Sequence, residues 1–171
     1  MSNEAPRPRS PAGTRRRSVA RLAAVQALYQ IDLSGTPAEQ VIGEFLKHRL
    51  GREIDGERYG EADPALFAEI VRGAIERQAD LDRAISAALT PDWPLERLET
   101  VLRAILRAGA FELMARSDVP APVAINEYLD IAHAFFAGKE PGLVNGVLDR
   151  LAHVLRPGEI ADERRGGPAP R

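Results

Sequence analysis

Residues 63–89 read DPALFAEIVRGAIERQADLDRAISAAL, and this stretch decides the class of fold. Asp63 followed by Pro64 is typical of a helix start, because an Asp side chain accepts the first free amides and Pro fits the first turn. Apolar residues then recur at helical spacing: Leu66, Phe67, Ile70, Val71, Ala74, Ile75, Leu81 and Ile85. The pattern predicts one helix that runs to about Leu89.

The same signals, a capped start and an apolar stripe, recur along the rest of the chain. They predict five further helices at about 15–32, 37–50, 94–114, 122–136 and 139–154. The stretch 51–62 is charged and contains three glycines, so we expect a loop there. No segment has convincing strand character. We therefore expect an all-α fold, a compact bundle of six or seven helices.

Length and composition are those of one domain with tails. The 171 residues are 44% hydrophobic, enough for one substantial core. We expect a helical domain over residues 15–156, and disordered tails at 1–14 and 157–171, which are rich in Pro and Gly. The absence of Cys excludes disulfides and thiolate metal sites. The sequence contains no membrane-type or signal-type apolar run, so we expect a soluble cytoplasmic protein without membrane contact.

The positive charge of the chain is concentrated at its N-terminus. The net charge is −2, yet the first 21 residues hold only one acidic residue and six arginines, namely Arg7, Arg9, Arg15, Arg16, Arg17 and Arg21. Arg near a helix start is slightly unfavourable, because the helix dipole there attracts anions. Arg is well suited to forked contacts with phosphate and to stacking on bases. The basic segment therefore favours a nucleic-acid partner over a merely solubilising tail.

The sequence contains no catalytic constellation. None of the three histidines lies in a metal or triad motif, and there is no phosphate-binding Gly-rich loop after a strand. Glu127 and Asp130 share a helical face and are suited to metal ligation in principle, but such pairs are usually solvated. We therefore expect no enzymatic activity, no cofactor and no metal.

A second candidate surface is the turn that contains Phe135, Phe136 and Lys139. Two adjacent aromatic residues cannot both face the core from one helix, because neighbours lie about 100° apart around the axis. One ring is then free to stack on a base, with Lys139 near a phosphate. The alternative, that both rings pack under the corner between the helices, is favoured when the residues are considered alone.

Three strings in the C-terminal half resemble one known family. They are RSDVP at 116–120, VAINE at 123–127 and VNGVLD at 144–149, in the order and at the spacing found in the NusB family of bacterial transcription antitermination factors. The N-terminal half resembles the family more loosely, through the arginines of 15–17 and AVQALY at 24–29. The resemblance covers about residues 15 to 155.

The resemblance implies an all-helical RNA-binding protein without catalytic activity. Such a protein recognises the boxA element of nascent RNA, especially in ribosomal RNA leaders. It binds together with NusE, a ribosomal protein, and assembles with other Nus factors on elongating RNA polymerase. Homodimerisation is left open by the sequence.

The family's functional residues map onto named positions of this chain. For RNA binding they are Arg15, Arg16, Arg17, Arg21, Phe135, Lys139 and Asn145. For the NusE interface they are Arg107, Phe111, Glu112 and Asp118.

Two alternative functions remain at this stage. One is a helical protein-interaction module that binds NusE or a similar subunit without RNA. The other is the NusB-like accessory domain of an RNA methyltransferase system, which would need a downstream catalytic domain.

Overall fold

The computed structural model of the chain describes residues 11–50, 53–54, 57–58 and 62–159, and these residues confirm the all-α class. The helices are α1 (Pro11–Ser34), α2 (Ala38–His48), α3 (Pro64–Glu76), α4 (Gln78–Ala88), the 3-10 helix η1 (Leu95–Arg97), α5 (Thr100–Ala115), α6 (Ala121–Phe135) and α7 (Glu140–Leu155). The loop expected at 51–62 contains one antiparallel pair of two-residue strands, β1 (Glu53–Ile54) and β2 (Glu57–Arg58).

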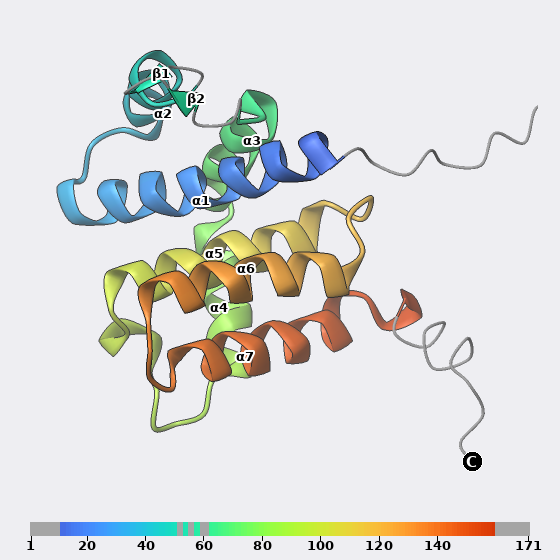
Figure 1. Cartoon of the computed structure of the whole chain (residues 1–171). Helices are drawn as coiled ribbons and strands as arrows, with labels where there is room; N and C mark the ends of the chain where they lie inside the picture. The colour runs from blue at the N-terminus through green and yellow to red at the C-terminus, as the bar shows by residue number, and fades with distance from the viewer. Residues whose placement is uncertain (1–10, 51–52, 55–56, 59–61, 160–171) are drawn as a thin grey trace, which may run out of the picture.

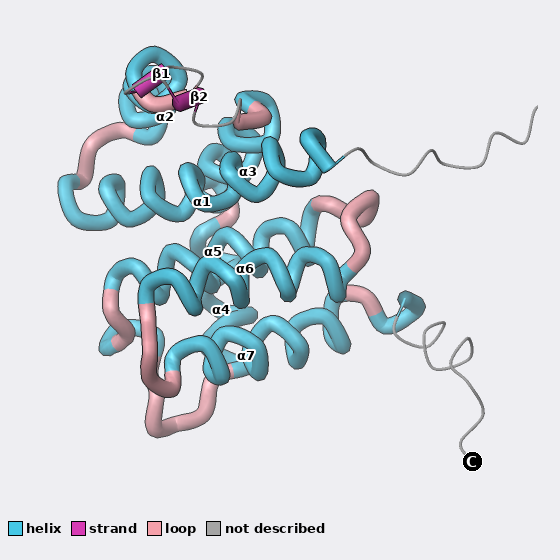
Figure 2. Tube along the Cα trace, in the orientation of Figure 1, coloured by secondary structure: helices cyan, strands magenta, loops and turns pink. Residues whose placement is uncertain are grey.

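The helices form two groups that meet along α1 and α5 (Figure 1). α1, α2 and α3 pack against one another, and α5, α6 and α7 do the same. α5 is the central element, since it contacts α1, α3, α4, α6 and α7 (Figure 2). Most of its residues are buried, as expected for a helix that is surrounded by others.

α1 extends beyond its predicted range at both ends, from Pro11 to Ser34. Its buried face is rich in small side chains: Ala20, Ala23, Ala24, Val25, Ala27 and Leu28 lie in the core. Three other apolar residues are less buried, since Val19 and Leu22 only edge the core and Tyr29 is exposed. The four alanines on the buried face allow α1 to lie close to α3 and α5.

The stretch 63–89 is divided into two helices. Its start is as predicted, since Asp63 Oδ1 accepts the N–H of Leu66 at 3.0 Å. The prediction of one continuous helix is wrong, because Arg77 leaves helical geometry with φ −102° and ψ 13°. The break has a packing reason: α3 lies against α1, α2 and α5, whereas α4 lies against α5 and α7.

Two further boundaries differ from the sequence prediction. The helix expected from about 94 is interrupted, since η1 is followed by an extended Leu98 and α5 begins only at Thr100. At the other end, residues 157–159 are helical, although we expected the tail to begin at 157.

Two glycines set the distance between helices. A Cβ atom at Gly73 in α3 would lie 2.1 Å from the ring of Phe111 in α5. At Gly109 in α5 it would lie 3.0 Å from Leu148 in α7 and 3.3 Å from Tyr128 in α6. The close contacts of α5 with three neighbours therefore require the absence of a side chain at these points.

Across the described ranges, none of the helices combines the length and the apolar character that crossing a bilayer requires.

Candidate nucleic-acid interface

Arg15, Arg16 and Arg17 lie in the early turns of α1. Arg15 and Arg16 are exposed and Arg17 is half-buried. The first turn of α1 contains no acidic residue. The structure therefore keeps three neighbouring arginines in the second turn of α1, with no acidic side chain in the turn before them. Arg7 and Arg9 lie outside the described residues.

Arg21 does not belong to this surface, which corrects the sequence prediction for it. Its side chain is only 2% exposed and lies between α1 and α5. Its Nε donates to Glu112 Oε2 at 2.8 Å and one terminal nitrogen donates to Glu112 Oε1 at 3.1 Å. This is the forked geometry of a strong ion pair, and it uses the edge of the guanidinium that a phosphate would need.

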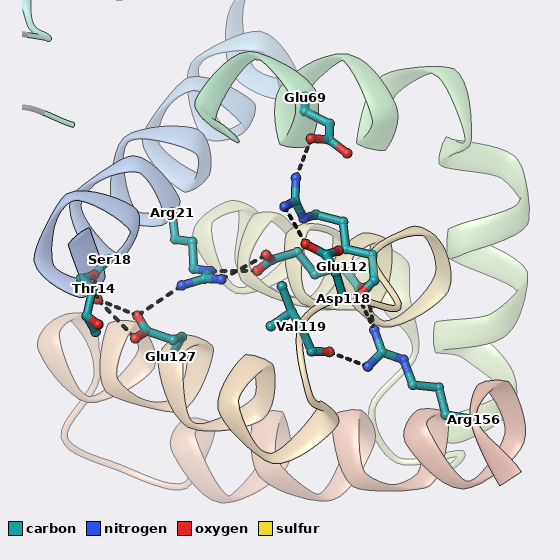
Figure 3. Close-up of polar contacts among 10 residues, drawn as sticks. Thr14, Ser18, Arg21, Glu69, Glu112, Asp118, Val119, Glu127 and Arg156 are labelled. Carbon is teal, nitrogen blue, oxygen red and sulfur yellow. Dashed lines mark hydrogen bonds and ion pairs between the residues drawn. The ribbon is translucent and has the colours of Figure 1, made fainter. Parts of the chain in front are cut away.

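A polar chain leads from the surface to this ion pair (Figure 3). The Ser18 hydroxyl lies 2.8 Å and 3.0 Å from the two carboxylate oxygens of Glu127. Glu127 in turn lies 3.8 Å from the Arg21 guanidinium. Burial alone would lower the pKa of Arg21, but the hydrogen-bonded carboxylate of Glu112 outweighs it and the pKa is raised. Arg21 is therefore charged at all relevant pH values.

Tyr128 completes the buried polar group. It is fully buried, and its pKa is raised well above the ordinary value, first because burial disfavours the phenolate and also because the Glu112 carboxylate is near. The phenol is neutral, so the buried cluster contains no third anion beside Glu112 and Glu127.

At the corner between α6 and α7 one of the two adjacent rings is exposed, so the alternative that both rings pack under the corner is wrong. Phe135 is 44% exposed, whereas Phe136 is partly buried and packs against the core. Lys139 and Asn145 are also exposed. All three predicted residues of this corner are therefore available to a partner.

A groove lies between α1 and α6, beside the arginine-rich turn. It has a volume of about 260 Å³ and is lined by Arg15, Ser18, Val19, Leu22, Glu127, Asp130, Ile131 and Ala134. Because Arg15 and Ala134 line the same groove, the arginine-rich turn of α1 reaches the end of α6, where Phe135 follows Ala134 directly.

Of the four residues predicted for a protein interface, two are not at the surface. Phe111 is 3% exposed and Glu112 is fully buried, so the sequence prediction for both is corrected. Phe111 packs on Gly73, and Glu112 is engaged with Arg21. Their places follow from α5 being the central helix of the bundle.

The other two residues predicted for that interface are accessible. Arg107 is partly exposed and donates two hydrogen bonds to Asp82, at 2.8 Å and 3.0 Å. Asp118 is exposed on the turn between α5 and α6 and lies 3.1 Å from Arg116. Both remain predictions for partner binding.

Arg156 is a structural residue that the sequence analysis did not identify. Its guanidinium is 8% exposed and donates to backbone carbonyls of α5 and the next turn: Glu112 and Leu113 at 2.9 Å, Arg116 at 2.7 Å, and Val119. It thus satisfies the Leu113 carbonyl near the end of α5, whereas the carbonyls of Glu112 and Arg116 also accept the backbone N–H groups of Arg116 and Val119. Figure 3 shows Arg156 approaching this turn from the end of α7.

Glu159 extends the same contact. One of its oxygens lies 3.1 Å from the Arg156 guanidinium, and the other accepts the N–H of Ala121 at 2.6 Å. The start of α6 and the end of α5 are therefore both held by residues that follow α7. The one sequence signal is the Arg-Pro pair at 156–157, because Pro disfavours helical geometry in the residue before it and so marks a helix end.

Glu127 and Asp130, considered above as metal ligands, lie in the groove, where Glu127 is used by Ser18 and Arg21. Within the described residues there is no group of three or more side chains suited to hold a metal ion.

Comparison with known proteins agrees with the resemblance seen in the sequence. A profile of the NusB family matches residues 18–153. The transcription antitermination proteins NusB of Brucella ovis and Brucella anthropi are 57% and 56% identical to this chain over 151 residues. The matches cover 88% of this chain and 88% and 90% of the two relatives. These relatives are named as antitermination proteins, not as enzymes.

Solved structures show the same architecture. NusB of T. maritima has a TM-score of 0.69 and 28% identity, over 90% of this chain and 99% of that one. A chain in the crystal structure of antitermination factors NusB and NusE in complex with dsRNA has a TM-score of 0.67 and 25% identity, over 82% and 98%. The fold is thus that of an all-helical transcription antitermination factor.

The chain belongs to the NusB family. The methyltransferase alternative has no support among these similarities.

Proposed function

We propose that this chain binds boxA-type single-stranded RNA in nascent ribosomal leader transcripts together with NusE, and that it acts in antitermination on elongating RNA polymerase. The observation that carries the proposal is the groove joining Arg15 to the exposed end of α6 on a NusB-family fold. It unites phosphate-binding and base-stacking groups on one surface. The protein then acts as a binding adaptor without catalytic activity, in the cytoplasm where transcription occurs.

NusE would raise the affinity by adding contacts beside those of this chain. The structure related to this one contains NusB, NusE and dsRNA together. Arg107 and Asp118 are the accessible residues proposed for that contact, on the surface of α5 and of the turn that follows it.

Binding to a boxA-containing RNA and to a scrambled RNA of equal length tests the proposal. Fluorescence anisotropy, with and without NusE and at two salt concentrations, should show tighter binding to boxA and a further gain with NusE. Equal affinity for both RNAs in every condition contradicts boxA recognition. A complex with NusE that has no RNA affinity would instead support the protein-interaction alternative.

Replacing Arg15, Arg16 and Arg17 with Ala should weaken RNA binding and flatten its salt dependence. Each lost phosphate contact reduces the slope of log K against log salt by about 0.7 for a single strand. The measurement is a titration at four salt concentrations, with circular dichroism to show that the helices persist. A variant with Ala at three exposed arginines of other elements, Arg77, Arg83 and Arg97, is the matched control. If both variants lose affinity equally, the arginines of α1 have no special role.

A further inference from the structure

The groove between α1 and α6 has a different chemistry from the arginine-rich turn beside it. Its walls include four apolar side chains, Val19 and Leu22 from α1 and Ile131 and Ala134 from α6. Two carboxylates, Glu127 and Asp130, lie among them. A phosphate would be repelled here, whereas a flat base would find apolar contacts. The groove is therefore suited to a nucleobase, while the phosphates follow the arginines.

The size of the groove agrees with one base. Pockets for drug-sized molecules span about 300–1,000 Å³. The groove, at about 260 Å³, lies just below that range and is open to solvent along its length. Phe135 is 44% exposed and lies one helical turn beyond Ile131, next to Ala134 at the end of the groove.

The two carboxylates differ in what they already bind. Glu127 is 17% exposed. Its carboxylate oxygens accept a hydrogen bond from the Ser18 hydroxyl and form an ion pair with Arg21. Asp130 is exposed, and among the described residues its carboxylate has neither a hydrogen bond nor an ion pair. Asp130 is thus the acceptor in the groove that remains available to a ligand.

We propose that Asp130 reads an unpaired guanine that enters this groove, which rests on the proposed function of RNA binding. A carboxylate only accepts hydrogen bonds, and it accepts two in parallel. Guanine presents two adjacent donors on its Watson–Crick edge, the N1–H and the N2 amino group. Unpaired RNA bases are commonly recognised on that edge. Arg15, at the rim of the groove, contacts the neighbouring phosphate.

The test compares RNA dodecamers that differ in one central base: guanine, hypoxanthine, adenine or uracil. Hypoxanthine retains N1–H but lacks the amino group, so it forms one of the two bonds. The full-length protein should prefer guanine over hypoxanthine by at least about fivefold, since a bidentate contact gives about 1–3 kcal/mol of discrimination. In Asp130→Asn this preference should disappear. The ratio between RNAs is the readout, because removing a negative charge also strengthens binding to any RNA.

Asp92→Asn is the matched control, since Asp92 is exposed and lies outside the groove. It should keep the guanine preference. A second variant, Ala134→Leu, fills the groove from an exposed position of α6 and should weaken binding of the guanine RNA without changing its salt slope.

Other outcomes overturn the inference. If Asp130→Asn retains the guanine preference, or the unaltered protein shows none, Asp130 does not read a guanine, although RNA binding itself still stands. If Ala134→Leu loses NusE binding and keeps RNA binding, the groove holds a protein segment. A failure of the proposed function is distinct, because the unaltered protein with NusE would then not distinguish boxA from scrambled RNA.

Discussion

Arg21→Met should lower the free energy of unfolding by about 3–5 kcal/mol, because the carboxylate of Glu112 would then be buried without its partner. Both side chains are almost completely buried, at 2% and 0% exposed. Urea unfolding followed by circular dichroism measures the change. The same variant, studied where it is still folded, should bind RNA with nearly unaltered salt dependence, since Arg21 is not at the surface.

The double variant Arg21→Met, Glu112→Leu is the control for this prediction. Replacing both members of a buried ion pair with apolar residues is often close to neutral. The double variant should therefore be clearly more stable than Arg21→Met alone, which is a coupling that a double-mutant cycle quantifies. A loss below about 1 kcal/mol in the single variant would mean that the pair is not needed for the fold, since that is the range of exposed pairs.

Arg156→Met should cost about 3 kcal/mol or more. Hydrogen bonds from a charged donor contribute about 1.5–3 kcal/mol each, and buried carbonyls left without a donor add to the loss. Amide hydrogen exchange should accelerate most at 116–121, the turn that Arg156 and Glu159 hold. Arg156→Lys should recover only part of the stability, because an ammonium cannot reach several carbonyls as the planar guanidinium does.

Arg150→Met tests whether these effects are particular to Arg156. Arg150 lies on α7, the helix that precedes Arg156. It is exposed and donates one hydrogen bond at 2.8 Å to the carbonyl of Ala88. Its replacement should cost about 1 kcal/mol, the usual net value of a single hydrogen bond. If the two variants lose equal stability, Arg156 does not hold the turn in the way its contacts indicate.

The helices could be predicted because their signals are local. Asp63 caps α3 as expected, and the predicted range 122–136 differs from α6 by one residue at each end. The break at Arg77 could not be predicted, because Glu76, Arg77 and Gln78 all favour helices. It arises from the different partners of α3 and α4, which depend on the folded bundle.

The candidate site was predictable in its outline but not in each residue. A cluster of arginines indicates a phosphate surface, yet it does not tell which members face inward. The spacing of the apolar residues indicates that Arg21 faces inward. Buried positions 24, 25 and 28 of α1 follow Arg21 at helical spacing, so Arg21 lies on their face of the helix. Its partner Glu112 lies 91 residues away in sequence, and such a contact is visible only in the structure.

The resemblance to the family does not distinguish exposed residues from buried ones. It places Phe111 and Glu112 at the NusE interface, but both are buried in α5, the central helix of the bundle. Asp130 lies just outside the matching string at 123–127, so neither composition nor the motif directed attention to it as an RNA contact.

The chain of contacts from Ser18 through Glu127 to Arg21 has a thermodynamic consequence. Ser18 lines the surface groove, and Arg21 binds Glu112 of α5 in the interior of the bundle. A ligand bound by the first turns of α1 binds the folded chain and not the unfolded one, so its binding energy adds to the stability of the fold. The Glu127 carboxylate belongs both to the groove and to the contact with buried Arg21. RNA bound at the first turns of α1 should therefore raise the temperature of thermal unfolding, and that temperature then reports indirectly how much of the protein has bound RNA.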